Sequence, residues 1–269
     1  MKFLTSSSEI FEKTRQNNFK ELLLLASSIK KDLDIGVLYE DYINGNKALD
    51  KLQDIWYDNN YDFSVYDSDY YLAEAFRCWK DYSCRYLKLF RKFVQNNSDM
   101  FNSISSVVDI GCGIAYSTVA IKCIFPNAEV FGTNLPNTLQ SKLGKIVTSS
   151  TGCILVDDNL KANDGKHIDI LFASEFFEHI PTPIDMLIAL INTYTPNYIV
   201  FANTFTQKAI GHFNEYFYGD AKLYGTEVSR LFSKTLKYYG YGKVNTHFYN
   251  NRPNIYKLNL MVQNHLLNF

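Results

Sequence analysis

Apolar residues recur every three or four positions through most of the first hundred residues, which is the period of an amphipathic helix. The clearest stretches are FKELLLLASSIKKDL (19–33) and YLAEAFRCWKDYSCRYLKLFRKFVQ (71–95). The Tyr- and Asp-rich stretch between them, residues 54–71, has no clear period and is expected to form a surface loop. The alternative is a lid that faces the substrate. Tyr66, Tyr70 and Tyr71 could then contact a ligand, although core packing or a surface position is the first expectation for them. Trp79 and Tyr82 lie on the second amphipathic stretch and are expected in the core.

From about residue 105 the pattern changes to short apolar strands separated by helices. Such alternation predicts a parallel sheet with helices on both faces. Two further strands joined by the turn-like NNRPN predict a final hairpin, so the last strand should run antiparallel. The expected strands are 105–110, 128–134, 152–158, 167–174, 197–205, 243–249 and 255–264, and the expected helices are 115–125, 135–147, 183–194 and 221–240. We expect Thr182 to cap the third of these helices, with Pro183 in its first turn, and Gly240 to end the fourth.

Length and composition fit one large α/β domain with a helical segment before it. We place the division at residues 1–100, a helical cap or substrate segment, and 101–269. The formal charge of −1 offers no overall electrostatic attraction to nucleic acid or to an anionic membrane. The first residues do not have the pattern of a signal peptide, and Leu22–Ala26 is far too short to span a bilayer, so a soluble, cytoplasmic protein is expected. Five cysteines without a CxxC pair predict neither a disulfide framework nor a zinc knuckle.

The sequence VVDIGCGIAYSTVAI (107–121) places a glycine-rich turn between a buried strand and a helix. Such a turn lets a ligand approach the backbone and the helix N-terminus. Dinucleotide-binding proteins use GxGxxG, but here Tyr116 stands at the third glycine position, which weakens a dehydrogenase interpretation.

Asp109 followed by Gly111 and Gly113 resembles motif I of class I S-adenosylmethionine-dependent methyltransferases, D/E-x-G-x-G-x-G, with Ala115 at the third glycine position. HIDILFASEFFEHIPTP (167–183) resembles the FDLVxxSEVLEHIPDP segment of methyltransferases that include the ubiquinone-pathway O-methyltransferases. The resemblance covers about residues 105–205. It implies a Rossmann-like, seven-stranded, mostly parallel sheet with an antiparallel last strand, and S-adenosylmethionine as cofactor.

The same resemblance implies a set of cofactor contacts. The glycine turn (Gly111, Cys112, Gly113) would pass under the methionine part and the ribose, and Asp109 would support the turn and its contact with the cofactor's amino end. Asn134 stands where the family usually has an acidic residue for the two ribose hydroxyls, and it lacks the charge. Either Asp157 or Asp158 would lie near the adenine amino group. We expect Leu135 and Ser174 to line the same site.

Glu175, Glu178 and His179 follow the spacing E-x-x-E-H, and positions i, i+3 and i+4 of one helical turn share a face. His212 follows the fifth strand, and strand ends of a parallel sheet converge on one edge. The set resembles the metal site of small-RNA 2′-O-methyltransferases, which implies Mg²⁺, Mn²⁺ or Fe²⁺ as the ion. The alternative is that the motif is retained without a metal. His212, His179 and Glu175 are the candidate catalytic residues, through deprotonation of an acceptor hydroxyl.

The leading hypothesis is therefore an S-adenosylmethionine-dependent O-methyltransferase for a small polar, sugar-type or phosphoryl-type acceptor, assisted by a divalent metal. RNA-terminal 2′-O-methylation is one alternative, against which the near-neutral charge argues. A catalytically silent cofactor-binding module is the other, suggested by Asn134.

Overall fold

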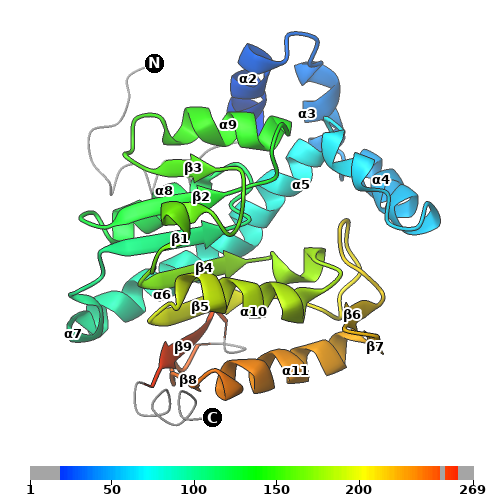
Figure 1. Cartoon of the computed structure of the whole chain (residues 1–269). Helices are drawn as coiled ribbons and strands as arrows, with labels where there is room; N and C mark the ends of the chain where they lie inside the picture. Colours follow the sequence, from blue (N-terminus) through cyan, green and yellow to red (C-terminus); the bar gives the residue numbers. More distant parts are fainter. Residues whose placement is uncertain (1–18, 249–251, 260–269) are drawn as a thin grey trace.

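A twisted seven-stranded sheet forms the centre of the protein in the computed structural model, which describes residues 19–248 and 252–259 (Figure 1). The strand order is β3-β2-β1-β4-β5-β9-β8. The first five of these pair in parallel, and β9 is antiparallel to both β5 and β8. The strands are β1 Ser106–Ile110, β2 Glu129–Thr133, β3 Ile154–Val156, β4 Ile170–Ser174, β5 Tyr198–Ala202, β8 Tyr241–Lys243 and β9 Asn254–Leu258. The expected Rossmann-like α/β sheet with an antiparallel last strand is confirmed.

Helices cover both faces of the sheet because its central strands are apolar on both sides. On one face α6 (Cys84–Asn96) packs against α8 (Tyr116–Ile124), and α8 packs against α9 (Leu139–Thr148). On the other face α10 (Pro183–Tyr194) packs against α11 (Gly225–Tyr238). Gly240 follows the end of α11 with a positive φ of 85°, as expected for a residue that ends a helix.

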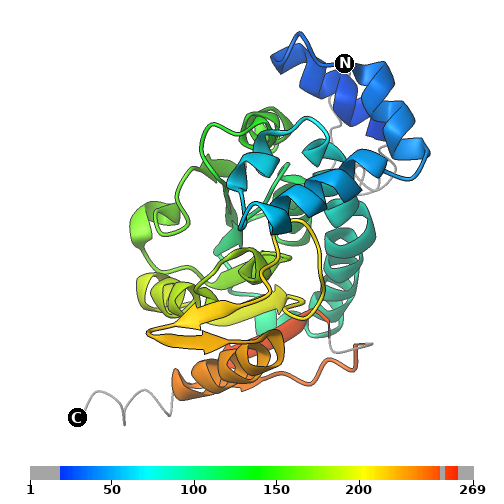
Figure 2. The same cartoon turned by 90° about the vertical axis from the view of Figure 1, so that its right-hand side faces the viewer.

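The N-terminal part consists of α2 Phe19–Ile29, α3 Ile35–Ile43, α4 Lys47–Asp58, the short 3₁₀ helix η1 Phe63–Asp67, α5 Tyr71–Arg77, the π-helical turn η2 Cys78–Ser83, α6 and the short α7 Ser98–Phe101. Figure 2 looks onto the edge where the parallel strands end and shows the N-terminal helices lying over that edge. One cluster of buried side chains runs through both the N-terminal helices and the sheet. The division at residue 100 thus separates two patterns of secondary structure that share one core.

The prediction of a loop over residues 54–71 is wrong for the first residues of that range. Helix α4 continues to Asp58, and Trp56 is fully buried. Its ring packs edge-on against Tyr66 and Phe213, with centroids 6.2 and 5.3 Å away. Phe213 is more than 150 positions from Trp56, so part of the contact that buries this segment is not visible in the local sequence.

The helix expected over residues 221–240 also begins later than expected, at Gly225. Residues Ala221–Leu223 instead form β7, which pairs with β6 (Tyr216–Tyr218) in a hairpin that the sequence did not indicate. Helix α10 does begin at Pro183, but the Thr182 side chain makes no capping hydrogen bond. The first strand of the C-terminal pair covers Tyr241–Lys243, so it shares only Lys243 with the expected strand 243–249, and that prediction is wrong for residues 244–248. Part of the last expected strand lies outside the described residues.

Within the described ranges, no helix has the length and apolar character that a membrane span requires.

Candidate functional site

A cavity of about 200 Å³ opens at the edge of the sheet where the parallel strands end. Ligands of open α/β sheets bind at this edge, because the loops that leave the strands diverge there. Eight of the thirteen candidate cofactor-binding, metal-binding and catalytic residues line the cavity, namely Gly111, Cys112, Gly113, Asn134, Leu135, Ser174, Glu175 and His179. Asp109, Asp157, Asp158, Glu178 and His212 do not line it.

The two glycines of the turn after β1 have different roles. Both have positive φ, +69° at Gly111 and +56° at Gly113, which favours glycine at each. A Cβ at Gly111 would lie 2.4 Å from the Cδ2 of Phe176, so the ring of Phe176 packs directly on this backbone. At Gly113 the Oε1 of Gln140, at 3.5 Å, is the only atom of the described residues within 4 Å of that point. Gly113 therefore leaves main chain open to the cavity.

Asp109 lies below this turn and is 2% exposed. It accepts hydrogen bonds from Ser117 Oγ (2.6 Å) and Thr118 Oγ1 (2.8 Å), both in the first turn of α8. Burial raises the pKa of the carboxyl to about 7, although the two hydroxyl donors oppose the shift. Asp109 thus anchors α8 behind the glycine turn, and its side chain does not reach the cavity.

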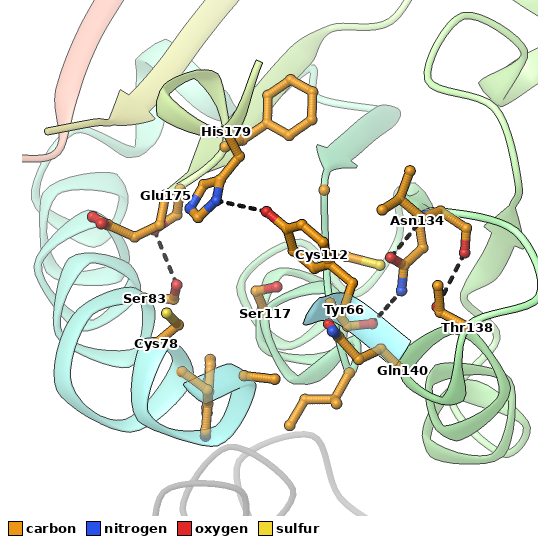
Figure 3. A pocket seen from close by; sticks show the side chains of 18 of the residues that line it. Tyr66, Cys78, Ser83, Cys112, Ser117, Asn134, Thr138, Gln140, Glu175 and His179 are labelled. Carbon is orange, nitrogen blue, oxygen red and sulfur yellow. Dashed lines mark hydrogen bonds between the residues drawn. The ribbon is translucent and has the colours of Figure 1, made fainter. Parts of the chain in front are cut away.

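Asn134 is tied to the glycine turn by its own side chain. Its Nδ2 donates to the carbonyl oxygen of Gly113, and its Oδ1 accepts from the backbone N–H of Leu135 at 2.9 Å. It lines the cavity, yet both ends of its amide are already engaged (Figure 3).

The two aspartates considered for the adenine end do not line the cavity. Asp157 pairs with Lys145 at 3.2 Å, and Asp158 pairs with Lys161 at 3.4 Å. The next residue, Asn159, lines the cavity instead, with its Oδ1 accepting from Thr133 Oγ1. Its place beside the two aspartates was the only sequence signal for it. Thr138 and Gln140 also line this end, and no motif indicated them.

Glu175 lines the other end of the cavity, and ligand atoms of Glu175, Glu178 and His212 all lie within 4.8 Å of one another. The backbone of Glu175 is in the left-handed region (φ 52°), a strained conformation for a non-glycine residue. Glu178 is fully buried, and its Oε1 accepts from the N–H of Thr204 at 2.8 Å. The Nδ1 of His212 lies 2.8 Å from the carbonyl oxygen of Gln207. Because a carbonyl only accepts, Nδ1 carries the proton, and Nε2 keeps its lone pair.

His179 does not join this group, which corrects the expectation that all four residues meet. Glu178 and His179 lie in a 3₁₀ turn, η4 (Phe177–His179), that Glu175 precedes, so the α-helical spacing argument does not apply. The Nδ1 of His179 is instead 3.1 Å from the hydroxyl of Tyr66. Its ring is still near that of His212, with centroids 4.8 Å apart.

Burial shifts every titratable group of this cluster toward its neutral form. It raises the pKa of Glu175 to about 7, against the opposing charge of Arg252, and it raises the pKa of Glu178 well above its ordinary value together with the charge of Glu175. Burial and the neighbouring His212 lower the pKa of His179 to about 3, and burial also lowers the pKa of His212. Neutral imidazole is the form that binds metals. A histidine with so low a pKa is a weak general base, which disfavours that role for His179.

The cluster fits a divalent cation. Two carboxylates and one imidazole nitrogen are a donor set for Mg²⁺, Mn²⁺ or Fe²⁺. The Oε1 of Glu175 is buried without a hydrogen-bond partner among the described residues, and such an atom is costly unless something binds it. The bond from His212 Nδ1 to a carbonyl is the usual support of a metal-bound histidine.

Aromatic side chains of the N-terminal part hold the loop that carries His212. Trp56 Nε1 donates to the carbonyl oxygen of His212 at 2.7 Å, and Tyr57 donates to that of Ala209 at 3.1 Å. At Gly211, a Cβ would lie 2.2 Å from both His179 Nδ1 and the Tyr66 hydroxyl, so the loop is wedged between them.

The same N-terminal part forms one wall of the cavity. Tyr66 and Tyr71 line it, which agrees with the lid interpretation of this segment, and Tyr70 does not. Trp79 is buried as expected but also lines the cavity, and Tyr82 is only half-buried. The π-helical turn η2 presents Cys78, Trp79 and Ser83 to the cavity.

No protein-family model matches the chain, and no curated protein matches it. Solved structures with a similar arrangement include the N-terminal domain of EvdMO1 with SAH bound (TM-score 0.34, 13% identity, 41% of this chain and 48% of that one). A second is the plantazolicin methyltransferase BpumL with a desmethylPZN analog and SAH (TM-score 0.40, 20% identity, 63% of this chain and 63% of that one). A third is the magnesium protoporphyrin IX methyltransferase ChlM from Synechocystis PCC 6803 with SAM (TM-score 0.42, 16% identity, 83% of this chain and 96% of that one). The chain spans less than two thirds of the length of the first two. These TM-scores are all below 0.5, and so the function has to be argued from the chain's own cavity.

Proposed function

We propose that this chain is an S-adenosylmethionine-dependent methyltransferase. The observation that supports this most is the meeting of two separate motifs in one cavity. Gly111 and Gly113 from the D-x-G-x-G turn and Ser174-Glu175 from the end of β4 lie on the same lining, although some 60 residues separate them in sequence. Both are motifs by which the sequence resembles that family, and the cavity lies at the sheet edge where such folds bind ligands.

The cofactor would lie over the glycine turn, with its nucleoside toward Asn134 and Gln140 and its methionine part toward Ser174. S-adenosylmethionine supplies a methyl group made electrophilic by a sulfonium. The protein's contribution is position: the open main chain at Gly113 lets the ligand approach, and the Glu175–His179 end faces the remaining space of the cavity (Figure 3).

An oxygen acceptor follows from the groups at that end. Glu175, Glu178 and His212 would hold the divalent cation, which would supply a Lewis acid that lowers the pKa of an acceptor hydroxyl. The carbonyl of Gln207 fixes the tautomer of His212, and the N–H of Thr204 orients Glu178. His179, with Tyr66 on its Nδ1, would orient the acceptor by hydrogen bonding.

The acceptor is proposed to be a small molecule. The cavity is closed on one side by Phe63, Tyr66, Tyr71 and Trp79, and among the described residues no lysine or arginine lines it. A polynucleotide chain would need such cations along its phosphates, so the lining gives no support to RNA-terminal methylation. It also favours a neutral hydroxyl compound over a phosphorylated one.

A catalytically silent binding module is the second candidate, and Asn134 is the residue that favours it. Calorimetry with S-adenosylhomocysteine, followed by transfer of a labelled methyl group to a panel of small hydroxyl compounds, separates the two. An enzyme binds and turns over, whereas a silent module only binds. At a ligand concentration of 100 times Kd, binding should also raise the free energy of unfolding by about 2.7 kcal/mol. No heat and no stabilisation at millimolar ligand would contradict both candidates.

A further inference from the structure

The ribose end of the proposed cofactor site lacks the carboxylate that the glycine-turn motif leads one to expect. Asn134 stands at that position, and both ends of its amide are bound to the protein's own backbone. These two bonds leave the amide one N–H and one oxygen lone pair, and they hold it against the glycine turn. The two nearby carboxylates, Asp157 and Asp158, lie outside the cavity and are paired with lysines. Neither aspartate is therefore placed to take the hydroxyls, and Asn134 has only half of its hydrogen-bonding capacity left for them.

Gln140 is placed for that contact. It lies in the first turn of α9 and lines the cavity beside Asn134 and Thr138 (Figure 3). Its Oε1 is 3.5 Å from the point where a Cβ of Gly113 would stand, so the amide lies directly above the open main chain of the turn. Among the described residues its side chain has no hydrogen-bond partner, whereas Thr138 bonds to Ser141 N and Leu135 O.

We infer that Gln140 is the residue that binds the ribose hydroxyls of the cofactor, in place of Asn134. This inference rests on the proposed methyltransferase function. A primary amide suits a vicinal diol, because its oxygen accepts from one hydroxyl while its NH₂ donates to the other. Cofactor binding through Gln140 leaves the Asn134–Gly113 bond intact, so the glycine turn keeps its shape in the complex.

The test combines removal of the Gln140 side chain with removal of each ribose hydroxyl of the ligand, and asks whether the two changes affect Kd independently. The Kd of the full chain is measured by calorimetry for S-adenosylhomocysteine and for its 2′-deoxy and 3′-deoxy analogues, with wild type, Gln140→Ala and Gln140→Glu. We expect Gln140→Ala to weaken S-adenosylhomocysteine about tenfold, the loss typical of one or two neutral hydrogen bonds. Its effect on at least one deoxy analogue should be less than about twofold, since the partner hydroxyl is already absent. Gln140→Glu should bind S-adenosylhomocysteine within about threefold of wild type, because a carboxylate also accepts from hydroxyls.

Two controls make the outcome decisive. Gln95→Ala, a glutamine-to-alanine change on an exposed position of α6, should leave all three Kd values unchanged. Thermal unfolding without ligand should be the same for Gln140→Ala and wild type, which shows that the variant folds.

An equal loss for all three ligands in Gln140→Ala, or no loss, would overturn the inference while leaving the proposed function in place. The inference would also be overturned if Asn134→Ala, and not Gln140→Ala, weakened S-adenosylhomocysteine more than the deoxy analogues. A wild type that binds none of the three ligands would overturn the proposed function and the inference with it.

Discussion

Replacing Asp109 by asparagine should make the protein more stable relative to wild type as the pH rises. The carboxyl is 2% exposed, and its two hydrogen-bond donors are the neutral hydroxyls of Ser117 and Thr118. Burial raises the pKa values of the nearby thiols of Cys112 and Cys153, and the charge of Asp109 raises them further, so both thiols remain neutral. No cation among the described residues compensates the carboxylate for its loss of water, whereas an asparagine oxygen can accept the same two bonds.

The magnitude follows from the pKa. Burial raises the pKa of Asp109 from 3.8 in an exposed carboxyl to about 7 in the folded protein. Since each pKa unit corresponds to about 1.36 kcal/mol, ionisation of Asp109 destabilises the folded state by about 4 kcal/mol. Between these two pH values the folded state binds the extra proton, so stability falls as the pH rises. From pH 5 to pH 8 the wild type should lose about 2.5 kcal/mol relative to Asp109→Asn, or about 5–10 °C in Tm.

Urea unfolding of both proteins at pH 5, 6, 7 and 8, without ligand, measures this difference. Asp169→Asn is the matched control at the opposite end of the sheet. Burial alone would raise the pKa of Asp169, but hydrogen bonds from Ser105 and Ser106 outweigh it and lower the pKa. That carboxylate is ionised in both states between pH 5 and 8, so its own titration should add no pH dependence to the gap in this range, and the gap should shrink below about pH 4. A constant gap between wild type and Asp109→Asn over pH 5–8 would refute the reasoning.

Three further changes test the site. Gly113→Leu should fill the open turn and abolish binding of S-adenosylhomocysteine in calorimetry, and unchanged affinity in this variant would place the ligand elsewhere. Gly111→Ala should lower Tm, because its Cβ meets the ring of Phe176. Chelation should cut turnover sharply, and full turnover after exhaustive chelation would exclude the metal. His212→Ala should weaken Mn²⁺ binding, measured by EPR, at least about tenfold, whereas the control His167→Ala, at an exposed histidine outside the cluster, should leave it unchanged. Trp56→Phe removes the hydrogen bond to the His212 carbonyl, so it should destabilise the protein by about 1 kcal/mol and speed amide hydrogen exchange in residues 209–214. Unchanged exchange would show that the loop does not depend on this bond.

The order of elements and the glycine turn could be predicted from the sequence, because both are local. The apolar runs of β1, β4 and β5 are short, doubly buried and followed by helices, and this pattern alone predicts a parallel sheet. Gly111 and Gly113 are where a left-handed turn between a strand and a helix needs them. Parallel topology then brings the ends of β1 and β4 to one edge, so the meeting of the turn with Ser174 and Glu175 was implied as well.

The direction of each side chain was decided only by the tertiary structure. His179 follows Glu178 directly but turns to Tyr66, because Glu175 has a left-handed backbone and the residues after it form a 3₁₀ turn. Asp157 and Asp158 pair with lysines, so their neighbour Asn159 faces the cavity. Gln140 belongs to no motif and reaches the site only because α9 begins beside Gly113. A sequence pattern reports which residues a backbone can place at an edge. Which of them meets a ligand depends on hydrogen bonds and packing between residues far apart in the chain, and those contacts exist only once the chain has folded.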